Sequence, residues 1–319
     1  MSTVHLLRNP GMSLDLTWIE NLRVNHPAIL RRTQHLSNSR SLKKEWQAAW
    51  LVRAIECMDL TTLSGDDTEG RVKRLCAKAR NPLRKDMLDA LGLKGGLKTG
   101  AVCVYHDMIP TAVEVLQGTG IPVAAVSTGF PAGLSSHETK LREIELSVKA
   151  GAAEIDIVIT RKHVLQGNWQ ALYQEMCDYR KACGEAHVKA ILATGDLQTF
   201  ENVAKASWVC MMAGADFIKT STGKESVNAT LDVSLVMTRA IRDYAALTTH
   251  KVGYKPAGGI ASAKLALQYL VLMKEELGDE WLNPHFFRFG ASSLLTDIER
   301  QLEHHITGSY SAAHRHAMP

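Results

Sequence analysis

The sequence lacks the features by which several classes of protein are recognised. It has no run of about 18 apolar residues, the length that a membrane-spanning helix needs. No apolar core of a secretory signal stands near its first residue. Its six cysteines include no C-x-x-C pair and no spacing typical of a zinc site. These absences predict a cytoplasmic protein with reduced thiols, no membrane contact and no bound metal.

A strong excess of charge of one sign is missing too. The formal net charge is +4, from 37 basic and 33 acidic residues, which is too small to indicate a nucleic-acid partner. The stretch from Arg71 to Lys98 is locally basic, but no aromatic residue is interleaved with the basic ones to stack on bases. We interpret this stretch as solvated helix faces.

Nucleotide-binding signatures are also absent. No G-x-G-x-x-G follows the first predicted strand. The segment "STGK" is similar to the end of a P-loop, but Glu225 follows Lys224 where Ser or Thr is required, and no glycine lies at the required distance upstream. We therefore expect no nucleotide and no other cofactor.

What the sequence does contain is a unit that recurs eight times. Each unit has a short run rich in β-branched residues, a loop rich in Gly, Ser and Thr, and an amphipathic helical segment. Strands that alternate with helices indicate right-handed βαβ units and a parallel sheet. The eight runs are "CMDLTTL" (57–63), "AVCVYH" (101–106), "PVAAVSTGF" (122–130), "AEIDIVIT" (153–160), "HVKAILATG" (187–195), "DFIKTST" (216–222), "KVGYKPAGG" (251–259) and "FFRFGASS" (286–293).

Eight such units predict an α/β fold of the (β/α)8 TIM-barrel type, with an open doubly wound sheet as the alternative. Residues 1–50 are expected to form an N-terminal helical extension and residues 51–305 the catalytic barrel. Residues 306–319 are expected to form a polar, flexible C-terminal tail. The histidines in and just before this tail, His304–His305, His314 and His316, are interpreted as solvated and not as metal ligands.

In a barrel of this kind the active site lies at the carboxyl ends of the strands. Polar and reactive side chains stand at these ends in six places: Asp59 and Thr61 on the first strand, Cys103 on the second, Asp156 on the fourth, Lys219 on the sixth and Lys255 on the seventh. A surface lysine is the simpler interpretation of Lys219, but a barrel buries both faces of its strands. An amine desolvated in the barrel mouth becomes a usable nucleophile for carbonyls.

Asp156 lies between isoleucines in "EIDIVI". An unpaired carboxylate in an apolar strand is costly, so we expect either backbone donors or, preferably, a lysine ammonium across the barrel as its partner. Lys255 precedes Pro256, which holds it in an extended conformation.

The loops after the last three strands are rich in Gly, Ser and Thr. Loops after the last two strands of a barrel often bind phosphate through backbone amides and a helix N-terminus, and Lys224 would add a positive charge. The predicted phosphate-binding residues are Thr222, Gly223, Lys224, Gly258, Gly259, Gly290, Ser292 and Ser293. This inventory suits a Schiff-base aldolase acting on a small phosphorylated sugar. A sugar-phosphate isomerase with Asp156 as its base, or a non-catalytic binder, stays open.

The motifs "ADFIKTSTGK", "GYKPAGGI", "MDLTTLSGDDT" and "FRFGASSLL" resemble those of deoxyribose-phosphate aldolase, from about Glu56 to Arg300. The resemblance implies that Lys219 forms the Schiff base, Lys255 lowers its pKa, and Asp156 relays protons through a water. It places Asp59, Thr61 and Cys103 near the sugar. The implied reaction is reversible cleavage of 2-deoxy-D-ribose 5-phosphate to glyceraldehyde 3-phosphate and acetaldehyde, in deoxynucleoside breakdown. A homo-oligomer is compatible with the sequence.

Three positions depart from the pattern of this family. Ala261 stands where many members have an arginine, and Ala193 stands where many bacterial members have a glutamate. Many members end in a tyrosine that is thought to reach the site, whereas this chain ends in "HAMP", and we do not assume that Tyr310 replaces that tyrosine. The long N-terminal segment is similar to that of eukaryotic members.

Overall fold

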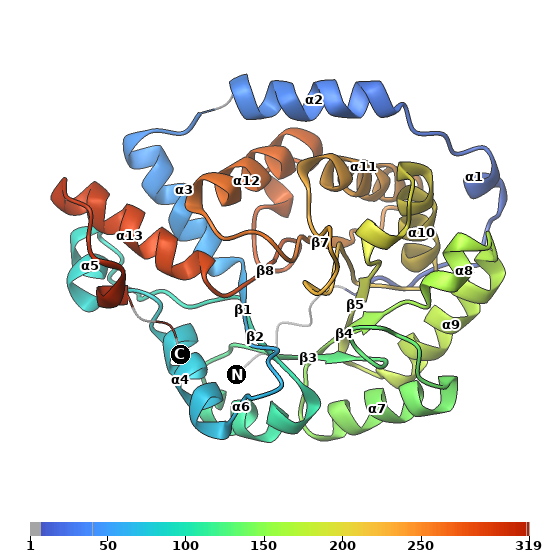
Figure 1. Ribbon diagram of the computed structural model, residues 1–319, viewed down its shortest axis with the longest axis horizontal. Coiled ribbons are helices and arrows are strands. Elements are labelled where there is room, and N and C mark those ends of the chain that lie inside the picture. The colour runs from blue at the N-terminus through green and yellow to red at the C-terminus, as the bar shows by residue number, and fades with distance from the viewer. Residues whose placement is uncertain (1–7, 40, 317, 319) are drawn as a thin grey trace.

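The computed structural model describes residues 8–39, 41–316 and 318. Its centre is one sheet of eight strands with the order β7-β6-β5-β4-β3-β2-β1-β8, in which every ladder is parallel (Figure 1). The strands are β1 Met58–Thr61, β2 Ala101–Val104, β3 Val123–Ser127, β4 Glu154–Val158, β5 His187–Ile191, β6 Phe217–Lys219, β7 Gly253–Lys255 and β8 Phe289–Ala291. Each lies within one of the eight predicted runs.

The sheet closes on itself between β7 and β8. Single parallel bridges join Tyr254 to Phe287 and Ala257 to Gly290, while β8 also pairs with β1 along its length. The predicted TIM barrel is therefore confirmed, and the open doubly wound sheet is wrong.

Helices surround the barrel and connect its strands (Figure 1). Several begin with a Ser, Thr or Asn whose side chain accepts a hydrogen bond from a first-turn backbone amide, the preferred helix start; these caps are Thr68, Ser136, Asn168, Thr199, Thr230 and Ser262. The helices are α4 Glu69–Arg80, α5 Lys85–Ala90, α6 Ile109–Leu116, α7 His137–Lys149, α8 Arg161–Leu165, α9 Trp169–Ala182, α10 Phe200–Met212, α11 Leu231–Thr248, α12 Ala263–Leu277 and α13 Leu294–Thr307.

Three further helices precede the first strand: α1 Thr17–Glu20, α2 His26–Ser39 and α3 Lys44–Glu56. Figure 1 shows α2 running outside α11 and α12, and Arg32 of α2 pairs with Glu276 of α12 at 3.0 Å. The expected boundary at residue 50 falls inside α3, because this helix packs against α12 and α13 and leads directly into β1.

The interpretation of the terminal histidines as solvated is wrong for His316. Its ring is 1% exposed and lies at the end of a short 3-10 helix, Ala313–His316, packed on α13. Its Nε2 lies 2.6 Å from Glu303 Oε2 and 2.9 Å from Ser311 Oγ. Glu303 on α13 and Ser311 in the loop before the 3-10 helix are thus both partners of Nε2, a tertiary arrangement that composition does not reveal. His305 and His314 are exposed as expected.

The apolar core lies between the barrel and its helices, but the barrel interior itself is charged. Asp59, Asp156, Lys189 and Lys255 are all fully buried inside it. Within the described chain, no helix is both long enough and apolar enough to cross a membrane.

Candidate active site

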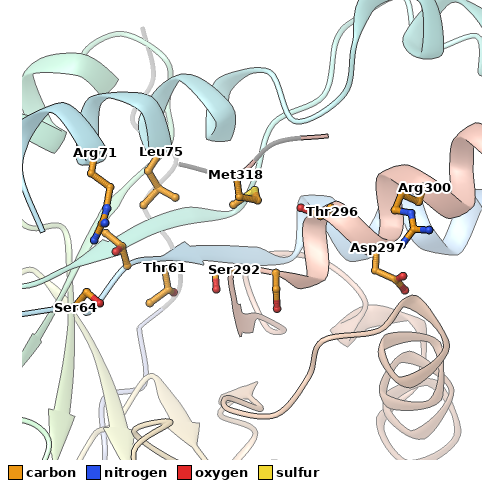
Figure 2. A pocket seen from close by; sticks show the side chains of 11 residues that line it. Thr61, Ser64, Arg71, Leu75, Ser292, Thr296, Asp297, Arg300 and Met318 are labelled. Atoms are coloured by element: carbon orange, nitrogen blue, oxygen red, sulfur yellow. The ribbon is translucent and has the colours of Figure 1, made fainter. Parts of the chain in front are cut away.

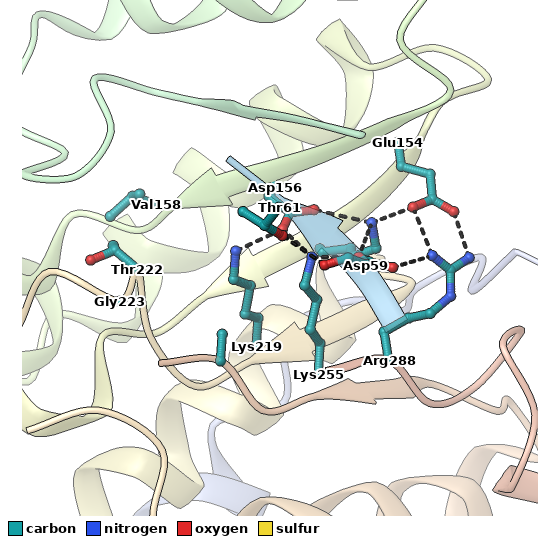
Figure 3. A network of polar contacts seen from close by, with 12 residues as sticks. Asp59, Thr61, Glu154, Asp156, Val158, Lys219, Thr222, Gly223, Lys255 and Arg288 are labelled. Carbon is teal, nitrogen blue, oxygen red and sulfur yellow. Dashed lines mark hydrogen bonds and ion pairs between the residues drawn. The ribbon is translucent and has the colours of Figure 1, made fainter. Parts of the chain in front are cut away.

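The three residues predicted to carry the chemistry meet inside the barrel, as Figure 3 shows. Lys219 and Lys255 are register partners on β6 and β7, so their side chains run in parallel. The Nζ atoms of both lysines lie 2.7 Å from the same oxygen, Oδ2 of Asp156 on β4. The expected lysine partner of Asp156 is therefore present twice.

A second carboxylate and a third lysine join this group. Asp59 on β1 accepts a hydrogen bond from Lys255. Lys189 on β5 donates to Asp156 Oδ1 at 3.0 Å and lies 3.6 Å from Asp59 Oδ2. Asp59 was predicted to lie near the sugar, whereas here its carboxylate is buried among cations.

A further ion pair lies closer to the amino-terminal ends of the strands. Arg288, just before β8, donates to Asp59 Oδ1 at 2.5 Å and to Glu154 Oε1 at 2.8 Å. Glu154 also accepts from Lys189. A continuous chain of ion pairs therefore connects Arg288 to Lys219 across the barrel (Figure 3).

The sequence analysis missed Glu154, Lys189 and Arg288. Each stands in a quoted apolar run, within "AEIDIVIT", "HVKAILATG" and "FFRFGASS". The signal that identified Asp156, a charge among buried apolar neighbours, was available for all three.

The charges of this network balance without Lys219. Three carboxylates (Asp59, Glu154 and Asp156) face three other cations (Lys189, Lys255 and Arg288), so a protonated Lys219 would be an uncompensated fourth cation. A buried charge without a counter-charge is strongly disfavoured. The network therefore favours Lys219 as the neutral amine.

The direction of the pKa shifts agrees with this count. Burial lowers the pKa of Lys219, Asp156 opposes the shift, and the charge of Lys255 lowers the pKa further, with a net decrease. Burial also opposes ionisation of Lys255, but Asp156 and Asp59 outweigh it and raise its pKa. One lysine of the pair is thus prepared as a nucleophile while the other keeps its proton.

Lys255 reaches the centre because Gly290 has no side chain. A Cβ atom on Gly290 would lie 3.3 Å from Lys255 Cε and 2.8 Å from Ala257 Cβ. Gly290, which was predicted to bind phosphate, thus also packs closely beside Lys255.

The mouth above the lysines has an apolar side. Cys103 forms a small buried cluster with Ala124 and Val126, against which Tyr105 and Phe130 pack. Burial raises the pKa of the Cys103 thiol to about 11, so it stays protonated at neutral pH. This side of the mouth can contact an apolar part of a substrate.

Two of the predicted phosphate loops adjoin each other. A Cβ on Gly223 would lie 4.0 Å from Gly258 Cα, and Gly223, Gly258 and Gly259 all have positive φ, between 79° and 88°. The amides of Thr222 and Gly223 already donate to the carboxylate of Glu225, at 3.1 and 3.2 Å. Sequence reasoning did not assign this role to Glu225.

The third loop borders a cavity of about 500 Å³ beside the barrel mouth. Thr61, Ser292 and Ser293 line it together with Arg71 and Met318 (Figure 2). Ser292 and Ser293 immediately precede α13, whose first amides point toward this end. The serine hydroxyls and the first amides of α13 can hold an anion.

Other predicted or divergent positions lie farther out. Lys224 and Ala261 are exposed. Tyr310 is 67% exposed and its ring meets that of His304 edge-on. Ala193 is buried at the end of the fifth strand in the left-handed conformation, with φ of 55°.

The ion-pair network predicts an effect on stability. Arg288→Met removes the guanidinium partner of Glu154 and is expected to lower the free energy of unfolding by about 3–5 kcal/mol, because it leaves a buried charge unpaired. The midpoint of urea unfolding measures this loss. The double variant Arg288→Met/Glu154→Gln removes one charge of each sign and should recover much of it. Equal losses in both variants would contradict the account of charge balance.

Comparison with known proteins places the chain in a family. The model of the DeoC/LacD family of aldolases matches residues 53–299. The chain belongs to this aldolase family. It is 59% identical over 309 residues to deoxyribose-phosphate aldolase of Homo sapiens, covering 96% of this chain and 97% of the human protein. It is also 60% identical over 307 residues to the enzyme of that name from Mus musculus, covering 95% of this chain and 96% of the mouse protein.

Solved structures of the family share the fold. A putative deoxyribose-phosphate aldolase from Toxoplasma gondii superposes with a TM-score of 0.68 at 20% identity, over 85% of this chain and 97% of that one. A tetrameric deoxyribose phosphate aldolase from Aeropyrum pernix gives a TM-score of 0.59 at 22% identity, over 88% of this chain and 99% of that one. At these identities the likeness supports the barrel and no finer claim.

Proposed function

We propose that this chain is a deoxyribose-phosphate aldolase and that Lys219 is its Schiff-base lysine. The reaction is the reversible cleavage of 2-deoxy-D-ribose 5-phosphate to D-glyceraldehyde 3-phosphate and acetaldehyde. The observation that carries the assignment of Lys219 is the charge balance. The charges of the three buried carboxylates equal those of the three other buried cations, so no negative charge is left to balance a protonated Lys219. A neutral amine is what attack on a carbonyl requires.

The first step is addition of Lys219 Nζ to the C1 aldehyde of the open-chain sugar, followed by loss of water to give the protonated imine. The iminium accepts the electron pair of the C2–C3 bond as the C3 hydroxyl loses its proton. Cleavage releases glyceraldehyde 3-phosphate and leaves an enamine on Lys219. Protonation of the enamine at C2 and hydrolysis then release acetaldehyde and the free amine.

Asp156 and Lys255 are proposed to manage the protons of these steps. Asp156 Oδ2 lies 2.7 Å from Lys219 Nζ, so a water next to both can carry protons between the carboxylate and the substrate. Lys255 shares the same oxygen. Burial opposes ionisation of Asp156, but the charges of Lys189, Lys219 and Lys255 outweigh it, lower the pKa of that carboxyl and keep it ionised.

The two ends of the substrate are proposed to lie in different parts of the mouth. The two-carbon fragment that becomes acetaldehyde lies near Cys103 and its apolar neighbours. The phosphate lies over the loops at Gly258–Gly259 and Ser292–Ser293, and Lys224 and Thr61 lie at the edges of this region. Because Glu225 already accepts from the amides of Thr222 and Gly223, these two residues contribute mainly by shaping the loop beside Gly258.

The proposed activity is tested directly by incubation with 2-deoxy-D-ribose 5-phosphate and detection of acetaldehyde with alcohol dehydrogenase and NADH. Borohydride added together with acetaldehyde should reduce the imine to a stable adduct that peptide mapping places on Lys219. A sugar-phosphate isomerase or a non-catalytic binder needs no imine, so product formation without a trapped adduct would reject the Schiff-base mechanism.

The phosphate site leads to a prediction about substrate affinity. Ser292→Glu places a carboxylate just before the N-terminus of α13, where the substrate phosphate is proposed to bind. The two negative charges repel each other. We expect KM for 2-deoxy-D-ribose 5-phosphate to rise by about tenfold or more, which corresponds to about 1.4 kcal/mol. Unphosphorylated deoxyribose serves as the control, and its kcat/KM should change little. Equal losses on the two sugars would place the phosphate elsewhere.

We further propose that residues 51–305 act as one catalytic barrel in the cytoplasm and that the chain assembles with copies of itself. The tetramer named for the Aeropyrum pernix protein supports the last point by analogy. Light scattering on the purified chain tests the assembly.

A further inference from the structure

A large cavity opens at the end of the barrel opposite the lysine site. It has a volume of about 1130 Å³ and lies beneath the amino-terminal ends of four strands and β8. Four lining residues immediately precede strands: Gly100 before β2, Pro122 before β3, Ala153 before β4 and Arg288 before β8. Glu56 lies two residues before β1. None of the predicted site residues lines it.

The charged side chains that line this cavity are mostly basic. Arg53, Arg80, Lys98 and Arg288 carry positive charge, whereas Glu56 is the one acidic residue in the described part of its lining. Arg53 is neutralised by Glu56, at 2.8 Å, and Arg288 by the buried carboxylates of the barrel. The charges of Arg80 and Lys98 are left without a counter-ion.

Arg80 and Lys98 lack the acidic partners that several other basic residues between Arg71 and Lys98 have. Arg71 pairs with Asp66 and Asp67, and Lys78 and Arg84 pair with glutamates of α13. The side chain of Arg80, the last residue of α4, has no hydrogen bond or ion pair with any residue that the structure describes. Lys98 donates only to a neutral group, the carbonyl of Thr119, at 2.8 Å.

The other side of the cavity is apolar. Leu88, Leu97, Ile121, Pro122 and Pro284 contribute to its lining. Ligand sites in proteins typically enclose about 300–1000 Å³ and combine an apolar lining with a few directed polar groups. This cavity has that composition and is of comparable size.

We propose that this cavity is a second binding site, for a phosphorylated small molecule. The whole ligand is about the size of a nucleoside monophosphate, and the part that does not carry the phosphate presents an apolar face. Arg80 and Lys98 hold the phosphate, since guanidinium and ammonium groups at neutral pH donate charge-assisted hydrogen bonds to phosphate oxygens. The apolar body lies against Leu97, Ile121 and Pro284. The site does not depend on the proposed function, because Arg80 and Lys98 take no part in the ion-pair network around Lys219; only Arg288 belongs both to the cavity lining and to that network.

The test is isothermal titration with AMP as the probe, on the full chain. We expect AMP to bind, and adenosine and inorganic phosphate, which each carry one half of the recognised features, to bind at least about tenfold more weakly. The variant Arg80→Ala/Lys98→Ala should raise the Kd for AMP by about tenfold for each cation removed. Both side chains are exposed, so the thermal melting of the variant should match that of the unchanged protein.

Two further variants locate the bound probe. Arg74→Ala removes an exposed arginine of the same helix that does not line the cavity, and AMP affinity should not change. Ser292→Glu blocks the proposed phosphate site at the other end of the barrel and should leave AMP affinity unchanged as well. The proposal is overturned if AMP does not bind at millimolar concentration, if inorganic phosphate alone binds as tightly, or if Ser292→Glu abolishes binding while Arg80→Ala/Lys98→Ala does not.

Discussion

Lys219→Met is expected to reduce turnover to the uncatalysed background and to abolish borohydride trapping, while the protein stays folded. A methionine has nearly the length of lysine but no nitrogen, so no imine can form. The charge balance makes this substitution mild for the fold, because the network of Asp59, Glu154 and Asp156 with its three other cations remains complete. The expected cost is the hydrogen bond to Asp156, about 1.5 kcal/mol.

The stability losses of Lys219→Met and Arg288→Met test whether Lys219 is neutral. Lys219→Met and Arg288→Met each delete a buried basic side chain, but only the second deletes a charge that the network needs. Lys224→Met, in the exposed loop after β6, is the control for trapping with acetaldehyde, which carries no phosphate, and should retain the adduct. An adduct that persists in Lys219→Met would assign the Schiff base to another lysine. A loss of stability as large as that of Arg288→Met would mean that Lys219 is charged in the folded protein.

Lys255→Leu is expected to lower the rate at neutral pH by orders of magnitude and to move the acid limb of kcat/KM to higher pH. A free lysine has a pKa of about 10.4, so fewer than about one in a thousand is neutral at pH 7. In the native network burial and the charge of Lys255 lower the pKa of Lys219. Without Lys255, the carboxylates exceed the remaining cations by one, and protonation of Lys219 restores the balance. Its pKa therefore rises, and the neutral amine becomes scarce over a wider range of pH.

The pH profile distinguishes a Lys255 that lowers the pKa of Lys219 from a Lys255 that transfers protons or binds substrate. The rate of reductive trapping by acetaldehyde and cyanoborohydride, measured against pH, reports the fraction of neutral Lys219 without the later proton transfers. Lys255→Arg keeps a cation at the position and should leave the acid limb closer to its original place. If Lys255→Leu lowers the whole profile and the limb does not move, then Lys255 transfers protons or holds substrate and does not tune the nucleophile.

The fold could be predicted because its signal is local and repeated. Each strand is a short β-branched run followed by a polar loop and an amphipathic helix, and eight such units close a barrel. The docking of His316 on α13 could not be predicted in this way. It depends on Glu303 and Ser311 meeting the imidazole in space, and a polar segment near a terminus has the same composition whether it is docked or solvated.

The site was predictable where a residue type was improbable in its position. Asp156 between isoleucines and Lys219 at the end of a strand stood out for this reason, and the structure brings them within 2.7 Å of each other. The register that makes Lys219 and Lys255 neighbours follows from strand pairing, which the sequence does not specify. The hydrogen bonds that the amides of Thr222 and Gly223 donate to Glu225 could not be predicted either, because they depend on the conformation of the loop.

The charged interior has a consequence for laboratory evolution of this enzyme. Positions at the mouth, such as Thr61 and Cys103, can be varied one at a time, since none of them carries a charge that another residue must match. Inside the barrel, removing the charge of Glu154, Lys189 or Arg288 alone leaves a buried ion without its counter-charge. Improved variants there therefore require that a positive and a negative residue be replaced together. A library of single substitutions will therefore find new specificities around the rim and almost none in the interior, whereas a library that pairs substitutions across β4, β5 and β8 can explore both.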